Sequence, residues 1–127
     1  MLFQLREEHE KALAKVALDN FEGRTADHVR KNLPEQSAGL TEQALQDRIQ
    51  REAERSRRYG LTSERQIVRF VDANFLLGEH YLDDPAHQWA HELLGEKSSA
   101  DDRARRLLDG AVQRAPRGGQ KPQGGQK

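Results

Sequence analysis

Apolar residues recur along this chain at helical spacings, and prolines, glycines and capping residues divide the pattern into five segments. In the first segment the apolar positions fit one helical stripe. They are Leu5, Leu13, Val16, Ala17, Phe21, Val29 and Leu33. Pro34 disfavours the α conformation in the residue before it, so we expect a first helix over about residues 3–32, with Gly23 as the place for an irregularity.

Residues suited to helix ends predict four more helices after a loop over residues 34–40. Those suited to the N-cap are Thr41, Thr62 or Ser63, Asp84, and Ser98 or Ser99. Those suited to the C-terminal end are Gly60, Gly78 and Gly95. Ser63 and Gln66 also match the capping-box spacing. The residues expected to face inward are Leu45, Ile49, Ala53, Ile67, Val68, Phe70, Val71, Phe75, Leu76, Trp89, Leu93, Leu94, Leu107, Leu108, Ala111 and Val112.

No segment alternates between polar and apolar residues with a period of two, so we expect no strands. The predicted fold class is all-α, with about five helices in a compact, mostly antiparallel bundle formed by residues 1–115. Residues 116–127 contain the sequence Gly-Gly-Gln-Lys twice and no apolar side chain other than Pro116 and Pro122. Such a composition cannot bury a core, so we expect a disordered C-terminal tail.

Composition narrows the functional classes. The 127 residues are enough for one domain, and 21 basic residues balance 21 acidic ones, so the chain has no global attraction to nucleic acid or to an anionic membrane. The absence of cysteine excludes disulfides and thiolate metal sites. No apolar run approaches the roughly 18 residues of a membrane span, and the first residues do not resemble a signal peptide. We therefore expect a cytoplasmic protein.

Basic residues form the most extended candidate site. Four arginines recur at spacings of three and four on the second helix, and two more follow on the third. The candidate partner-binding residues are Arg48, Arg51, Arg55, Arg58, Arg65 and Arg69. They suit an acidic protein partner or, alternatively, nucleic acid. A third interpretation is a solvated face in which Arg48 pairs with Glu52 and Arg58 with Glu54.

His87 and His91 are the sharpest metal candidate, because histidines four residues apart share one helix face. Gln88 occupies the place of the catalytic glutamate in the zinc-protease motif, and an amide cannot act as a general base. We interpret the pair as part of an exposed polar face. No metal site is assigned.

Paired carboxylates around Tyr81 are the remaining candidate for acid–base chemistry. They are Glu79, Asp83 and Asp84, of which Asp84 is better explained as a helix cap. The chain contains no nucleophile elbow, phosphate loop or nucleophilic cysteine, and Trp89 is interpreted as a core residue. We therefore expect no catalytic residues, no cofactor and no enzymatic activity.

Short motifs across about residues 3–112 carry a resemblance. They are Tyr-Gly-Leu-Thr-Ser-Glu at 59–64, Phe70-Val71, Leu77-Gly78, Asp84-Pro85, Trp89-Ala90 and Leu94. This pattern resembles small helical bacterial proteins whose genes lie beside type VI secretion genes for PAAR or VgrG spike components and their toxic effectors. The resemblance implies an effector accessory, adaptor or immunity protein, without choosing among them, and it implies no catalytic residue.

We therefore expect a non-catalytic protein-binding module whose partner is another protein: an effector, a toxin or a spike component. The alternative is a helical nucleic-acid-binding regulator that uses the arginine face of the second helix. The sequence leaves open the identity of the partner, the choice between adaptor and immunity roles, and the oligomeric state.

Overall fold

The computed structural model describes residues 2–116, apart from the side chains of residues 2–8, 14 and 19. Within this part the protein is all-α and has no strand, as predicted. Its six α-helices and two 3-10 turns are α1 (Leu2–Asn32), α2 (Pro34–Ser37), α3 (Glu42–Arg58), α4 (Glu64–Leu77), η1 (Tyr81–Asp83), η2 (Pro85–His87), α5 (Gln88–Leu94) and α6 (Ala100–Arg114). The predicted C-terminal tail lies outside the described residues, except for Pro116.

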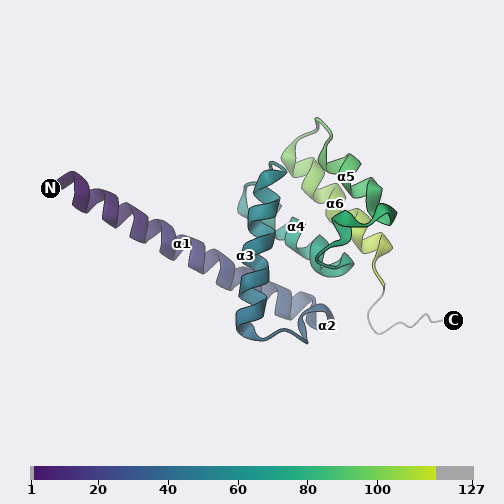
Figure 1. The fold of residues 1–127 in the computed structure, drawn as a ribbon, viewed down its shortest axis with the longest axis horizontal. Helices are drawn as coiled ribbons and strands as arrows, with labels where there is room; N and C mark the ends of the chain where they lie inside the picture. The colour runs from purple at the N-terminus through teal and green to yellow at the C-terminus, as the bar shows by residue number, and fades with distance from the viewer. Residues whose placement is uncertain (1, 117–127) are drawn as a thin grey trace.

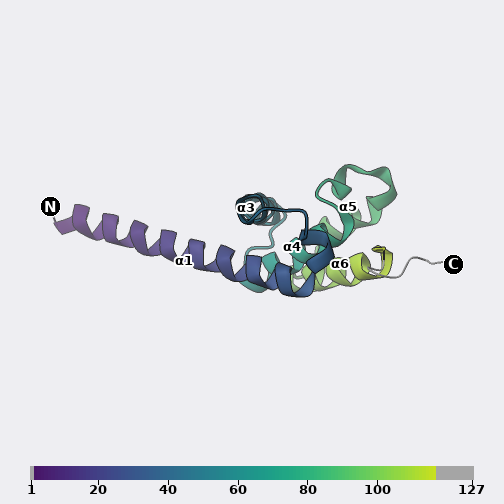
Figure 2. The same cartoon turned by 90° about the horizontal axis from the view of Figure 1, so that it is seen from below.

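Helix α1 is one unbroken helix, without the irregularity expected at Gly23. At 1.5 Å per residue it is about 46 Å long, and its N-terminal half projects away from the other helices (Figures 1 and 2). The predicted inward stripe is therefore wrong in this half. Leu13 and Val16 are 56% and 54% exposed, whereas Phe21 and Val29 are buried, because no other element reaches the projecting half.

The predicted loop over residues 34–40 contains the short helix α2. Pro34 ends α1 and also occupies the first turn of α2, where the missing N–H has no helical partner to lose. The guanidinium of Arg30 donates hydrogen bonds to the carbonyl oxygens of Ser37 and Leu40, the latter at 2.6 Å. The Arg30 side chain of α1 thus stabilises the segment that leads to α3. Local sequence rules could not reveal this contact.

Capping residues set the ends of α3 and α4 where the sequence predicts them. The Thr41 hydroxyl accepts a hydrogen bond from the Ala44 N–H at 3.1 Å. Ser63 and Gln66 form the complete capping box at the start of α4. Gly60 and Gly78 follow the two helices with φ of 82° and 105°, which favours glycine at both positions.

Asp84 caps a different element from the one expected. Its carboxylate accepts from the Ala86 N–H at 2.9 Å, but the turn it opens is the 3-10 turn η2, and α5 begins only at Gln88. The last helix agrees with the prediction, because the Ser99 hydroxyl accepts from the Asp102 N–H at 3.1 Å at the start of α6. The sequence therefore locates both caps but not the kind of helix that follows the first.

Two buried clusters share α4. The first lies between α1, α3 and α4 and contains Phe21, Ala26, Val29, Leu45, Ile49, Ala53, Ile67, Val71 and Phe75. The second lies mainly between α4, α5 and α6 and contains Leu61, Phe70, Ala73, Tyr81, Leu82, Ala90, Leu93, Leu94, Ala104, Leu107 and Ala111. Most predicted core residues are confirmed, but Val112 is 56% exposed.

Helix α3 crosses α1 steeply in both views, so the expected antiparallel packing does not extend to this pair (Figures 1 and 2).

Candidate protein-binding site

Arg48 is the first of the predicted partner-binding arginines, and its side chain is only 12% exposed. Its guanidinium donates a hydrogen bond to the carbonyl of Asn74 at 2.8 Å and lies 3.8 Å from the centre of the Phe75 ring. The predicted pairing with Glu52 is present, with Arg48 Nε 3.5 Å from Glu52 Oε2. These contacts join α3 to the C-terminal end of α4.

Glu52 is the fully buried centre of the same network. Its Oε1 accepts hydrogen bonds from Asn74 Nδ2 at 2.6 Å and from Arg55 at 3.1 Å. Burial raises the pKa of Glu52, and the Asn74 hydrogen bond and the positive charges of Arg55 and Arg48 oppose that rise. Glu52 lies three residues after Ile49 on the inward face of α3, which is the sequence signal that could have identified it.

Arg51 and Arg55 extend this network to Glu79, just after α4. Arg51 Nε donates to Glu79 Oε2 at 2.9 Å, which lowers the pKa of the Glu79 carboxyl. Arg55 donates to the Glu79 carbonyl, also at 2.9 Å. Three of the six predicted arginines therefore stabilise the packing of α3 on α4. The other three, Arg58, Arg65 and Arg69, form no ion pair with any carboxylate that the structure describes.

The two candidate metal-ligating histidines have separate partners. His87 Nδ1 accepts a hydrogen bond from Trp89 Nε1 at 3.3 Å, and His91 Nε2 contacts the carbonyl of Leu82. Among the side chains that the structure describes, no group of three or more His, Cys, Asp or Glu residues is arranged to hold a metal ion.

The carboxylates around Tyr81 also have structural contacts. Glu79 pairs with Arg51, and Asp84 caps η2. Tyr81 is buried, and burial raises the pKa of its phenol above the ordinary value. The arrangement matches the structural interpretation of this cluster.

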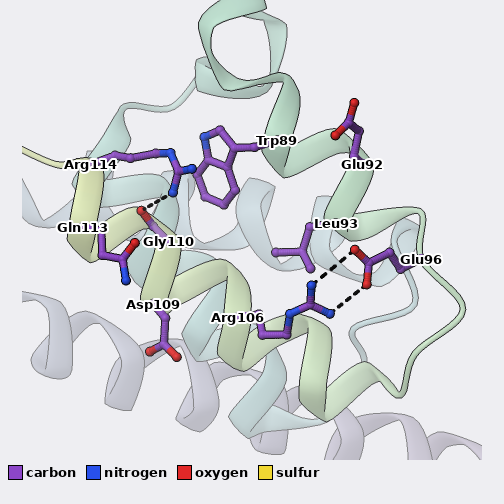
Figure 3. Close-up of a pocket in the computed structure, with 9 residues that line it drawn as sticks. All are labelled: Trp89, Glu92, Leu93, Glu96, Arg106, Asp109, Gly110, Gln113 and Arg114. Atoms are coloured by element: carbon purple, nitrogen blue, oxygen red, sulfur yellow. Dashed lines mark hydrogen bonds and ion pairs between the residues drawn. The ribbon is translucent and has the colours of Figure 1, made fainter.

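A groove of about 350 Å³ opens between α5 and α6 (Figure 3). Trp89 of α5 forms one wall, and its indole ring packs over Gly110 of α6. A Cβ atom at Gly110 would lie 2.6 Å from Trp89 Cζ3, so the ring can pack here only because glycine has no Cβ atom. Arg114, on the same side as Gly110, stacks on the indole with its Cζ 4.0 Å from the ring centre and donates to the Gly110 carbonyl at 3.2 Å.

The other end of the α5/α6 groove is polar. Arg106 of α6 binds both carboxylate oxygens of Glu96 at 2.7 and 3.3 Å (Figure 3). Leu93 lies between this ion pair and the indole, while Glu92, Asp109 and Gln113 complete the lining. An apolar floor between an aromatic–cation stack and a fixed ion pair can bury a side chain of a partner and hydrogen-bond its backbone.

Trp89 is only half-buried, so the expectation of a core tryptophan is met in part. Its ring packs against the second buried cluster, while its remaining surface faces the α5/α6 groove. The glycine that permits this arrangement is 21 positions away in the sequence, and no local pattern links the two residues.

His28 and Asp72 form a contact that the sequence did not reveal. His28 Nε2 lies 2.8 and 2.9 Å from the two carboxylate oxygens of Asp72, which joins α1 to α4. Burial raises the pKa of Asp72, and His28 opposes that rise. The partners are 44 residues apart, and neither stands out in the sequence.

No protein-family model, no curated protein and no solved structure matches this chain. Among residues 2–116, no helix combines the length and the apolar character needed to cross a membrane.

Proposed function

We propose that this protein is a non-catalytic protein-binding module and that the α5/α6 groove is its recognition surface. The observation that carries the proposal is the half-buried Trp89, whose indole packs against Gly110 and Arg114 of α6 at the edge of the groove. Tryptophan and arginine are the residues most enriched among interface hot spots. A ring that is already held by these contacts loses little conformational freedom when a partner covers it.

The proposed partner is a secreted bacterial effector, a toxin or a type VI spike component, and the chain acts as its accessory, adaptor or immunity protein in the cytoplasm. The support for this class of partner is the sequence resemblance, whose Trp89-Ala90 motif lies in α5 beside the groove.

The arginine face has a smaller part in this proposal than the sequence predicts. Arg48, Arg51 and Arg55 already bind Glu52, Glu79 and the backbone. The same contacts weaken the nucleic-acid alternative, because phosphate contacts need cations that are not already paired. Arg58, Arg65 and Arg69 remain predicted contacts for an acidic partner surface.

The test is to purify the chain together with the product of each neighbouring gene and to titrate any complex by calorimetry. Arg114→Ala removes the cation from the indole, and we expect it to weaken the complex at least tenfold, as for a hot-spot residue. Arg105→Ala is the matched control. Arg105 is on the same helix, pairs with Asp102 and Asp109, and does not line the groove, so its loss should leave the affinity unchanged.

Two results would contradict the proposal. One is that no neighbouring gene product forms a complex. The other is a complex whose affinity is the same for the unchanged protein, Arg114→Ala and Trp89→Ala, provided that circular dichroism shows both variants folded. The second result would keep the binding function but place it on another surface.

A further inference from the structure

The projecting half of α1 leaves apolar side chains without cover. Leu13 is 56% exposed and Leu18 is 39% exposed, and no other helix of residues 2–116 lies beside them (Figures 1 and 2). Helices gain most of their stability in water from packing an apolar face on another element, so a lone helix end of this kind needs a partner.

The C-terminal half of the same helix borders an open groove, which we call the α1/α4 groove. Its volume is about 420 Å³. Its apolar lining is Phe21, Val68 and Leu108, and its arginines are Arg24, Arg65 and Arg69. Arg24 pairs with the exposed Glu64 at 3.0 Å, whereas Arg65 and Arg69 form no ion pair with a described carboxylate. The groove therefore combines an apolar floor with a surplus of positive charge.

The projecting half of α1 has the complementary chemistry. Its acidic side chain on this side is the exposed Glu10, whereas the exposed Lys11 and Lys15 lie more than a quarter-turn away from Glu10 by helical geometry. One helical face of α1 also repeats at spacings of four and three, as in a helix–helix seam. This face contains Glu10, Ala14, Ala17, Phe21, Arg24 and His28. Ala17 allows close approach of a second helix, and Leu13 and Leu18 flank it.

From this complementarity we propose that two copies of the chain form a symmetric dimer, in which the projecting half of each α1 lies antiparallel in the α1/α4 groove of the other. A two-fold axis near Ala17 brings Glu10 of one copy beside Arg24 of the other. It also buries Leu13 and Leu18 of both copies. Such an interface is self-complementary and closed, as a two-fold dimer requires. The dimer does not use the α5/α6 groove and does not depend on the function proposed for it. It would cover Arg65 and Arg69, and would leave Arg58 as the predicted contact for an acidic partner surface.

Sedimentation velocity on the full chain over a range of concentrations tests the dimer. We expect a concentration-dependent shift from one to two chain masses. Ala17→Glu places two like charges at the axis and should weaken dimerisation at least tenfold. Ala12→Glu is the matched control, because Ala12 is also exposed but lies on the opposite side of α1 from the proposed seam by helical geometry.

A charge exchange tests the direction of the helices. Glu10→Arg and Arg24→Glu should each weaken the dimer, and the double variant should recover at least part of the loss, because the pair is restored in reverse. A chain that stays monomeric at every concentration overturns the proposal. That result is expected if α1 binds a different protein instead of a second copy. Equal weakening by Ala17→Glu and Ala12→Glu, or no recovery in the double variant, also overturns it.

Discussion

Arg55 and Arg58 lie one turn apart on α3, but their surroundings differ. Arg55 binds the buried carboxylate of Glu52 and the Glu79 carbonyl, whereas Arg58 is exposed. We expect Arg55→Ala to lower the free energy of unfolding by about 2 kcal/mol, since it leaves a buried charge with fewer partners. Arg58→Ala should change it by less than ~0.5 kcal/mol. Urea unfolding of both variants is the measurement, and equal losses would show that Arg55 is only a surface residue.

Glu52 gives the protein a pH dependence with a definite sign. Its pKa in the folded state is raised above the ordinary value, so the folded state holds the proton more tightly than the unfolded state. The contribution of Glu52 to stability is therefore present below the ordinary pKa and is lost as the pH rises through the raised pKa. Glu52→Gln removes this dependence.

We expect the stability of the unchanged protein relative to Glu52→Gln to fall as the pH increases from 4 to 7. The measurement is the free energy of unfolding of both proteins at several pH values in that range. Glu79 and Asp102, whose pKa values are lowered, give the opposite slope, but they are present in both proteins and largely cancel in the difference. A difference that grows with pH would mean that the paired arginines outweigh burial.

At the scale of the helices, sequence rules succeeded where the cause is local. Thr41, Ser63 and Ser99 cap their helices by accepting hydrogen bonds from the backbone N–H three positions further on, and this spacing is visible in the sequence. The existence of α2 was missed because the segment is held by Arg30, which lies on the preceding helix. Gly23 does not interrupt α1, since one glycine lowers helix propensity by only about 1 kcal/mol.

The two glycines inside helices allow a matched test. A Cβ at Gly23 would have no neighbour within 4 Å, so Gly23→Ala should stabilise the protein by ~0.5–1 kcal/mol through the better helix propensity of alanine. At Gly110 the same gain is opposed by a clash with Trp89 at 2.6 Å. We expect Gly110→Ala to destabilise by ~1–3 kcal/mol, in the range of overpacked cores.

Thermal unfolding measures both changes, and tryptophan fluorescence reports the second directly, because Trp89 is the only tryptophan of the chain. Its emission should shift to longer wavelength in Gly110→Ala and stay unchanged in Gly23→Ala. A stabilised Gly110→Ala protein with unchanged emission would show that the indole does not rest on Gly110.

For the whole molecule, the sharing of α4 between the two buried clusters has a measurable result. Ile67, Val71 and Phe75 of α4 belong to the first cluster, and Phe70 and Ala73 belong to the second. Neither cluster can keep its packing if α4 unfolds, so we expect a single cooperative transition.

Ile49→Ala tests this coupling, since Ile49 is fully buried in the first cluster and Trp89 reports on the second. The substitution should cost about 2–5 kcal/mol. It should shift the unfolding midpoint measured by Trp89 fluorescence as far as that measured by circular dichroism. Separate midpoints would show that the two clusters unfold independently.

The candidate site was less predictable than the fold, because its contacts join residues far apart in the sequence. The spacing of Arg48, Arg51 and Arg55 identifies one face of α3, but not that Glu79 and Asn74 bind it from the end of α4. Likewise, the sequence predicts that Trp89 is packed, but not that Gly110 leaves part of it open. Periodicity reports which residues share a face and says nothing about which element lies opposite.

The continuity of α1 has one more consequence, which concerns the opening of its backbone hydrogen bonds. Amide protons near residues 25–32 are protected by the packing of Ala26 and Val29, so their exchange requires the α1/α3 contact to open. Amide protons near residues 12–20 are protected only by the helix itself, and they exchange whenever it frays from its N-terminus. A single helix thus has two exchange regimes that meet near Gly23, and any molecule that covers its first half will move that boundary towards the N-terminus.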